Sequence, residues 1–445
     1  MTRKRIWRAD SVVLPDGQRP AAIAAEDGVI VAILDRDAVW QADEDISLAP
    51  SEVLLPGLID IHVHVNEPGR TEWEGFETAT RAAAAGGFTT LIDMPLNSSP
   101  CTTSLEALNI KKEAAQGKLS MDVGFWGGVV PGNLDELRPM WEAGVFGFKC
   151  FLGDSGLDEY PYIDRETLLA AMKEIASFDG LIIIHAEDAE ILNVAPGCEG
   201  RSYEAFMNSH PAEAEDASIR AVIEAVRETG CRAHILHLGS SSALETIAQA
   251  KKEGLPLTVE TTPHYLTFDA EEIPDGATEY KCCPPLRGHA NRMGLWEGLK
   301  AGIIDLVASD HSPSTADLKS LDTGDFGTAW GGISSVQLGF SAVWTQARQL
   351  GCSLEDVVRW QGANPATTVG LGARGSIVEG GPADFAVVDP EATFVVDKHE
   401  LHHKNPVSPY HGRELYGVVT STWLSGERID LNGPGTGREI SRNRP

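Results

Sequence analysis

The chain has 445 residues, 42% of them hydrophobic, which is enough for one large domain and a smaller one. Its formal net charge is −29, and this argues against nucleic acid or an anionic membrane surface as a partner, because both would repel the protein. Its apolar runs are too short to span a membrane, and the basic N-terminus lacks the apolar segment of a signal peptide.

Short polar and apolar alternations fill the first 50 residues, and turns at Asp16-Gly17 and Asp27-Gly28 separate them. Such runs are typical of antiparallel strands joined by tight turns. We therefore predict that residues 1–53 form part of a small β domain.

From residue 54 to residue 375, continuous apolar strands alternate with helical stretches, beginning with one apolar run from Val53 to Ile61. This alternation is typical of parallel βαβ units. Eight strands with helices between them predict a TIM-type (β/α)8 barrel, whose catalytic groups lie at the carboxyl ends of the strands. The eight strand candidates end near His62, Asp93, Trp126, Lys149, His185, His237, Glu260 and Asp310. The clearest helical stretches are Trp73–Ala85, Ser104–Gln116, Asp164–Ser177, Ala212–Thr229 and Ser240–Glu253.

Strand signals return after Gly375, at residues 376–378, 384–388 and 417–423. We predict that residues 376–433 pair with residues 1–53 to make one small β-sandwich domain, discontinuous in sequence. Residues 434–445 are rich in Gly, Arg and Pro, and we predict that they form a flexible tail.

Two histidines, His62 and His64, end the first strand of the predicted barrel. Side chains two residues apart on a strand point to the same face, so both imidazoles project together. Two neutral imidazoles form half of a metal site. Alone, the pair is explained equally well as two chance histidines on a strand, and the later strand ends decide between the two interpretations.

Lys149 lies inside an apolar strand, where a charged amine is costly unless it is paired or modified. One interpretation is a lysine whose amine reaches solvent at the strand end. Four candidate histidines favour another: a neutral amine takes up carbon dioxide and forms a carbamate that bridges two metal ions.

Three further strands end in candidate metal ligands. His185 ends one strand, and the next contains both His234 and His237, which face opposite ways because they are three residues apart. We favour His237 as the ligand, because it is nearer the strand end, and expect His234 to be structural. Asp310 ends the last strand, where a carboxylate could take a proton from water and deliver it to a leaving nitrogen.

The chain thus combines the His-x-His pair, the strand lysine, the two later histidines and Ser309-Asp310-His311. This combination resembles the cyclic amidohydrolases, the family of dihydroorotases, hydantoinases and allantoinases. The resemblance covers nearly the whole chain. It implies two divalent metal ions, zinc first, with manganese, cobalt and iron as alternatives. It also implies His62, His64 and Asp310 on one metal, His185 and His237 on the other, carboxylated Lys149 bridging both, and Asp310 as the catalytic base and acid.

Within this family the segments 62–76, 94–97, 147–151 and 329–333 are most similar to allantoinases. Dihydroorotases typically carry an arginine for the substrate carboxylate where this chain has Asn66. Hydantoinases typically carry a tyrosine after the lysine strand, and here none precedes Tyr160. The resemblance therefore implies that a hydroxide between the two metals opens the hydantoin ring of allantoin to give allantoate, a step of purine catabolism.

The same resemblance suggests the residues around the substrate. We expect substrate contacts from Asn66, Asn97, Ser155, Cys283 and Gly332, and we expect Glu187 and His264 to orient metal ligands. The cluster of His399, His402 and His403 looks like a metal site, but we assign it to a solvated or interface role.

Two alternatives stay open. The first is the same chemistry on another cyclic amide, in a hydantoinase or dihydropyrimidinase. The second is a metal-free structural scaffold, although such relatives lose ligands and this chain keeps all six. The seven cysteines are odd in number without paired spacing, which predicts reduced thiols and a cytoplasmic protein. Relatives of this kind imply a homo-oligomer, with a tetramer expected.

Overall fold

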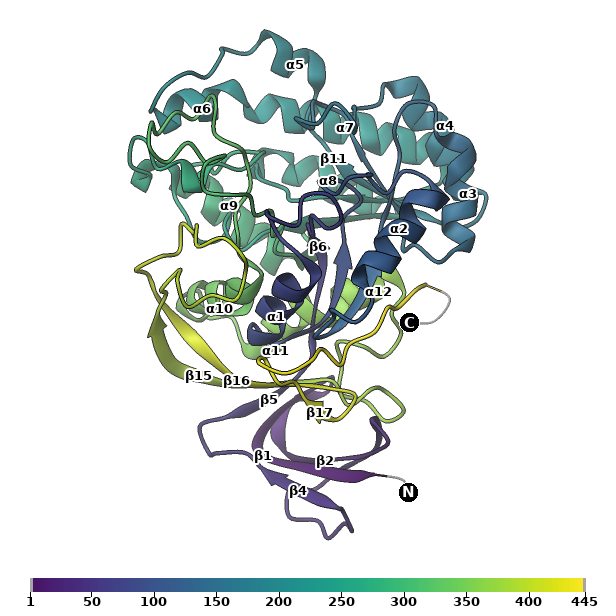
Figure 1. Cartoon of the computed structure of the whole chain (residues 1–445), viewed down its shortest axis with the longest axis vertical. Helices are drawn as coiled ribbons and strands as arrows, with labels where there is room; N and C mark the ends of the chain where they lie inside the picture. Colours follow the sequence, from purple (N-terminus) through teal and green to yellow (C-terminus); the bar gives the residue numbers. More distant parts are fainter. Residues whose placement is uncertain (1–2, 443–445) are drawn as a thin grey trace.

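The computed structural model describes residues 3–442 (Figure 1). Helices surround parallel strands in the upper part of Figure 1, and a β-sheet that contains the N-terminal strands lies below them. Within the described range, no helix combines the length and the apolar character needed to cross a membrane.

The upper part contains nine parallel strands in two hydrogen-bonded groups. Neighbours in each group follow one another in sequence, as expected for βαβ units. Only Trp126 separates β8 from β9, so the two groups are continuous along the chain. At the opposite edges, Val63 of β6 forms a parallel bridge with His311, which lies just beyond β14. The first group is β6 (Leu58–Val63), β7 (Phe88–Asp93) and β8 (Asp122–Phe125). The second is β9 (Gly127–Gly128), β10 (Phe148–Phe151), β11 (Leu181–His185), β12 (Arg232–Ile235), β13 (Leu257–Thr261) and β14 (Leu306–Val307).

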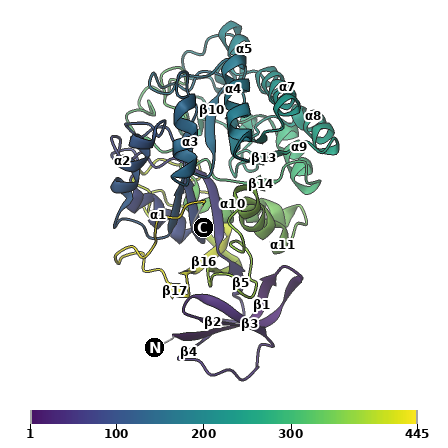
Figure 2. The same cartoon turned by 90° about the vertical axis from the view of Figure 1, so that its right-hand side faces the viewer.

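The helices begin where the sequence provides caps. Ser104 accepts a hydrogen bond from the Ala107 amide at the start of α2, and Asp164 accepts one from the Thr167 amide at the start of α4. Successive helices pack against one another outside the strands, as α3, α4, α7 and α8 do in Figure 2. The helices of eight or more residues are α1 (Phe76–Ala85), α2 (Leu105–Ala115), α3 (Leu134–Glu142), α4 (Arg165–Ala176), α7 (Ala212–Thr229), α8 (Leu244–Lys252), α9 (His289–Lys300) and α10 (Gly339–Gln349). Shorter ones are α5 (Ala189–Val194), α6 (Tyr203–Ser209), α11 (Leu354–Val358) and α12 (Asn364–Val369).

The lower part is a single eight-stranded sheet built from both ends of the chain. Strand β5 joins the two ends, because it pairs with β1 on one side and with β15 on the other. Strands from the two terminal regions therefore share one sheet, but residues 376–378 form no strand. The strands are β1 (Lys4–Leu14), β2 (Gly17–Glu26), β3 (Val29–Leu34), β4 (Glu44–Ser47), β5 (Val53–Pro56), β15 (Phe385–Val395), β16 (Glu414–Leu424) and β17 (Glu427–Arg428).

The predicted sandwich of two sheets is wrong, because hydrogen bonds connect all of these strands. The sheet instead curls around its own core. The ring of Trp7 on β1 lies 5.0 Å from that of Phe385 on β15 and 5.4 Å from that of Trp423 on β16, although β16 is three strands away from β1. Curling lets one sheet bury the apolar face that two stacked sheets would otherwise share.

The apolar run from Val53 to Ile61 is two strands, not the one we predicted. The chain leaves the lower sheet at Pro56 and enters the upper strands at Leu58. Between them, the Gly57 amide donates to the Asp384 carbonyl at 2.8 Å, and a Cβ on Gly57 would lie 2.2 Å from the Thr89 hydroxyl oxygen. Hydrophobicity could not reveal this break, because both strands are buried.

The predicted flexible tail is wrong for residues 434–442. The Gly437 amide donates to the Leu119 carbonyl and the Ile440 amide to the Val123 carbonyl, each at 2.9 Å, and the Ile440 side chain is buried. A Cβ on Gly437 would lie 2.0 Å from the Met121 carbonyl oxygen. The glycine therefore permits a close approach between two backbone segments, whereas the composition of this segment had suggested a flexible tail.

Candidate metal centre

His62, His64 and Asp310 meet at the carboxyl ends of their strands. His62 lies on β6 with His64 just beyond it, and their Nε2 atoms lie 3.1 Å and 3.4 Å from Asp310 Oδ1. All three side chains are buried, and one donor atom from each lies within 4.8 Å of the others. This arrangement of two imidazoles and a carboxylate is suited to a divalent metal ion.

The other two predicted histidine ligands lie beside this group. His185 ends β11 and His237 follows β12, and His185 Nδ1 lies 2.9 Å from His237 Nε2. The ring of His237 is 5.4 Å from that of His62. The remaining nitrogen of His237, Nδ1, is buried without a hydrogen-bond partner in the described residues. A buried orphan acceptor beside a second imidazole fits a second metal position.

Lys149 on β10 faces the same place. Its amine lies 3.5 Å from His62 Nε2, and the side chain is 1% exposed, so the amine does not reach solvent. Burial lowers the Lys149 pKa to about 8, against the attraction of Asp310 and Glu260, which raises it. A neutral amine is therefore accessible near neutral pH, as carbamate formation requires.

The side chains of this group differ in their protonation. Burial raises the pKa of Asp310, but the charge of His62 and hydrogen bonds from His62 and His64 hold it well below the usual range. Burial lowers the His62 pKa, yet the Asp310 and Glu260 carboxylates raise it to about 9. Burial and repulsion from His185 keep the His237 pKa well below its usual range. The group thus offers an ionised carboxylate and a neutral imidazole, the forms that bind metals.

Three of the predicted site residues have a strained backbone. Asn97, His237 and Asp310 adopt φ angles of 69°, 33° and 44°. Non-glycine residues rarely adopt positive φ, and such strain costs about 1–3 kcal/mol per residue and clusters at functional sites. The fold therefore holds these three side chains where unstrained backbone would not place them.

Sequence reasoning missed the role of Glu260. This buried residue of β13 contacts His62 Nδ1, lies 3.0 Å from His234 Nε2 and accepts a hydrogen bond from the His237 amide at 3.2 Å. Burial raises its pKa, but His62 and His234 hold it well below the usual value. Glu260 thus links two candidate ligands to His234, which does not face the metal group. Its position at a predicted strand end was the available signal.

A cavity of about 700 Å³ opens onto this group. Four of the five predicted substrate residues line it, namely Asn97, Ser155, Cys283 and Gly332. The fifth, Asn66, does not: it is fully buried and its amide donates to the Pro313 carbonyl at 3.2 Å. No contact among the described residues supports the predicted substrate role of Asn66, whose Oδ1 is buried without a hydrogen-bond partner.

Two of the lining residues have other partners. Asn97 Nδ2 lies 3.3 Å from His64 Nδ1, so this amide holds a candidate ligand. The Ser155 hydroxyl donates to the Tyr160 carbonyl at 2.6 Å, and its hydrogen atom is thus engaged within the loop.

The two residues expected to orient ligands differ in position. Glu187 Oε2 lies 2.8 Å from His185 Nε2, as an orienting carboxylate would. His264 is fully buried, and neither ring nitrogen has a hydrogen-bond partner in residues 3–442. Its nearest ring is that of Tyr265, so no contact supports the expected role of His264.

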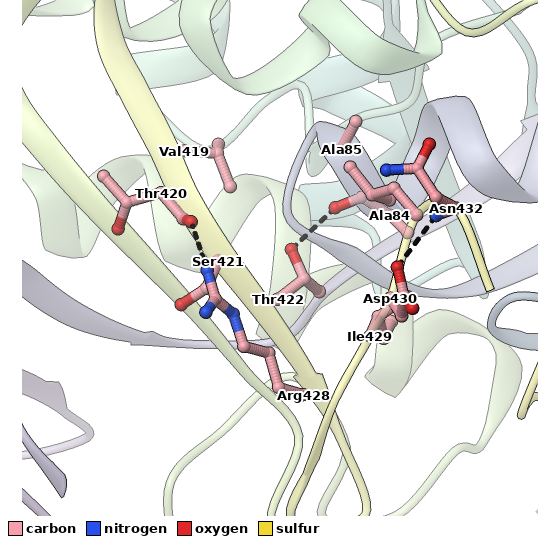
Figure 3. Close-up of a pocket in the computed structure, with 11 residues that line it drawn as sticks. Ala84, Ala85, Val419, Thr420, Ser421, Thr422, Arg428, Ile429, Asp430 and Asn432 are labelled. Carbon is pink, nitrogen blue, oxygen red and sulfur yellow. Dashed lines mark hydrogen bonds between the residues drawn. The ribbon is translucent and has the colours of Figure 1, made fainter.

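A second cavity, of about 350 Å³, lies between the end of α1, strand β16 and residues 428–432 (Figure 3). Its lining contains no histidine and none of the predicted site residues. The Thr422 hydroxyl there donates to the Ala84 carbonyl at 2.6 Å, a contact between helix and sheet. The candidate chemistry is confined to the larger cavity.

Comparison with known proteins agrees with this geometry. Residues 53–429 match the family described as the amidohydrolase family. The chain is 54% identical to an allantoinase from Streptomyces avermitilis over 98% of both chains. It is 43% identical to an allantoinase from Saccharomyces cerevisiae over 97% of this chain and 96% of the other. Among solved structures, it is similar to L-hydantoinase (dihydropyrimidinase) from Arthrobacter aurescens, with a TM-score of 0.92, 29% identity and coverage of 99% and 100%.

Proposed function

Because the chain belongs to the amidohydrolase family, we propose that it is an allantoinase, which hydrolyses the hydantoin ring of allantoin to give allantoate. The observation that carries this proposal is the meeting of His62, His64 and Asp310, with Lys149 and the His185–His237 pair beside them, at one cavity. Similarity to allantoinases along the whole chain supports the choice of ring.

We also propose that the parallel strands close into an eight-stranded barrel, with β8 and β9 acting as one strand. The Val63–His311 bridge and the hydrogen bond from the His64 amide to the His311 carbonyl, at 2.8 Å, support closure between the first and last strands. The barrel then begins at residue 57 rather than 54 and ends at residue 375. The small domain comprises residues 1–56 and 376–433.

The residues fit two divalent cations, for which zinc is our first choice. His62, His64 and Asp310 would hold one ion, His185 and His237 the other, and Lys149, as a carbamate, would contact both. Bound there, divalent ions polarise a carbonyl and lower the pKa of water toward 7.

Asp310 then moves the proton. Its carboxylate is ionised, lines the cavity and faces His62 and His64. It accepts a proton from the attacking water and delivers it to the ring nitrogen that leaves, since an amide nitrogen is a poor leaving group until it is protonated. Glu260 and Glu187 hold the imidazoles of His62 and His185 in orientation.

The cavity suits a neutral ring. Among the described residues no arginine lines it. The amine of Lys281 is already bound to the carbonyls of Phe326 and Ala329, and the ring of His210 faces the Cys283 sulfur. A substrate carboxylate, as in dihydroorotate, would therefore lack a free partner among these residues. Similarity to the hydantoinase structure keeps hydantoin and dihydrouracil as the second candidates. Against them, Tyr160 does not line the cavity, and its hydroxyl donates to the Lys149 carbonyl at 2.8 Å.

The proton-transfer role is tested with Asp310→Asn. The zinc-loaded variant should lose about 10³-fold in turnover of allantoin, the range for one positioned acid–base group. Circular dichroism should show an unchanged fold. Near-normal turnover in this variant would contradict the proposed role of Asp310.

We also propose a cytosolic location and a homotetramer. All seven cysteines are unpaired, in line with the expected cytosolic location. The homotetramer is carried by family resemblance alone, and sedimentation would test it.

A further inference from the structure

Cys283 and His210 meet at the cavity that holds the candidate metal centre. Cys283 Sγ lies 3.7 Å from His210 Nε2, and both residues line that cavity. His210 Nδ1 is 2.9 Å from the Ser209 hydroxyl, and this contact fixes the ring with its other nitrogen toward the sulfur. Nothing in the proposed hydrolysis uses either side chain.

The surroundings of His210 favour the charged form of its ring. Burial lowers the His210 pKa, but the charges of Cys283 and Glu187 and the hydrogen bond to Cys283 raise it to about 9. Lys281 also lines the cavity, and an Arg287 amine donates to the His210 carbonyl at 3.2 Å. An imidazolium in contact with a thiol stabilises the nucleophilic thiolate.

The other six cysteines lack such a partner: in residues 3–442, no other cysteine sulfur is hydrogen-bonded to an imidazole. Burial raises the pKa of the Cys101 and Cys231 thiols to about 11 and about 12. Cys352 is half-buried like Cys283 and remote from the cavity, although burial and the Asp356 charge raise the pKa of its thiol, and it serves as the comparison for Cys283.

The sulfur also lies where a modification would matter. A Cβ on Gly331 would lie 3.8 Å from Cys283 Sγ, so the thiol is between His210 and the glycine pair of residues 331–332. Gly332 lines the same cavity as His237 and Asp310. Atoms added to this sulfur would occupy space that the substrate needs.

We propose that Cys283, activated by His210, is a peroxide-reactive site whose oxidation closes the cavity and reversibly inactivates the enzyme. The thiolate sulfur attacks one oxygen of hydrogen peroxide, so that an S–O bond forms and the O–O bond breaks. Cys283 is oxidised to the sulfenic acid, and peroxide is reduced to hydroxide, which takes a proton from solvent to give water. Two equivalents of a small thiol restore the cysteine and leave a disulfide and water. The inactivation part rests on the proposed function, whereas the reactivity of Cys283 does not.

The test treats zinc-loaded full-length protein with hydrogen peroxide at pH 7. Dimedone reacts with the sulfenic acid, and mass spectrometry of each cysteine peptide detects the adduct. Allantoin turnover is measured in parallel samples without dimedone. We expect Cys283 to be labelled at least about 10-fold faster than Cys352, because His210 contacts the Cys283 sulfur, whereas burial and the Asp356 charge raise the Cys352 pKa. Turnover should fall in step with labelling of Cys283 and return with dithiothreitol.

Variants separate the parts of the proposal. His210→Gln should slow labelling of Cys283 about 10-fold, while Cys352→Ser should leave both labelling of Cys283 and inactivation as in the wild type. Equal labelling of Cys283 and Cys352, or unchanged labelling in His210→Gln, would overturn the activation. Full turnover by protein whose Cys283 is oxidised would overturn the closure. If His210→Gln does not fold, the comparison of Cys283 with Cys352 in wild-type protein still tests whether Cys283 is the more reactive thiol. Protein inactive on allantoin from the start would count against the proposed function and leave the labelling result valid.

Discussion

The substitution Glu260→Gln tests whether this buried carboxylate positions the metal ligands. Glu260 receives three hydrogen bonds, from His62 Nδ1, His234 Nε2 and the His237 amide, and it is fully buried. Glutamine keeps the shape of the side chain but carries no charge. Its amide group is a donor and would face one of these three donors.

The expected loss follows from these contacts. Hydrogen bonds to a charged group contribute about 1.5–3 kcal/mol each, against about 1 kcal/mol for neutral pairs. Weakening two of them by about 0.5–2 kcal/mol each and losing the third predicts a decrease of roughly 2.5–7 kcal/mol in the free energy of unfolding of the metal-free protein. Loss of a carboxylate that orients a metal-bound histidine typically weakens metal binding by about 10–100-fold. We expect both effects in Glu260→Gln.

Zinc affinity is measured by competition with a chromophoric chelator, and stability by urea unfolding of the metal-free protein. The control is Asp384→Asn, which changes another buried carboxylate, paired with Arg374 outside the cavity. The control should lose stability and keep its zinc affinity. Zinc affinity of Glu260→Gln within about threefold of the wild type would refute the positioning role, because the outer partners of metal ligands normally change affinity by more than this.

Three further predictions concern other parts of the molecule. First, the folded-state pKa of His62 is raised from 6.5 to about 9, so its stabilising contribution is complete below pH 6.5 and is lost as pH rises toward 9. Of the stability that metal-free protein loses between pH 6.5 and 8, roughly 2 kcal/mol should therefore come from His62. That share should be missing in His62→Asn, while the loss due to His210, whose pKa is also raised to about 9, remains; equal pH profiles of the two proteins would contradict this. Second, Lys319→Met should raise KM for allantoin about 10-fold, because the buried Lys319 amine binds the carbonyls of Trp330 and Gly332 beside the cavity; an unchanged KM would show that this loop needs no such restraint. Third, Ile440→Ala should cost about 2–4 kcal/mol in urea unfolding, since its side chain is buried; a loss below about 0.5 kcal/mol would mean that the segment contributes no packing.

The sequence was sufficient to locate the strand ends that carry chemistry. His62, His185 and Asp310 lie at or near the ends of apolar runs, and Lys149 lies within one. Parallel strands bring their carboxyl ends together, so the spacing along the chain predicted a cluster in space. The helix boundaries could also be predicted from nearby residues, because caps such as Ser104 and Asp164 act within one turn.

What the sequence could not predict depends on contacts between distant segments. Asn66 follows the His-x-His pair, yet it is turned inward by the loop near Pro313, about 250 residues away in sequence. In the sequence Glu260 looks like an ordinary strand residue, and its role depends on its contacts with His62 and His234. Gly437 suggested a loose tail, although its missing side chain permits packing against Met121. In each case the decisive partner lies outside any local pattern.

The central claim is tested most directly by side-by-side hydrolysis of allantoin, hydantoin, dihydrouracil and dihydroorotate with the same zinc-loaded protein. We predict turnover dominated by allantoin, with dihydroorotate the poorest because the cavity offers its carboxylate no free cation. A clear preference for another of the rings, or no hydrolysis of any of them by protein that carries stoichiometric zinc, would contradict the proposed function.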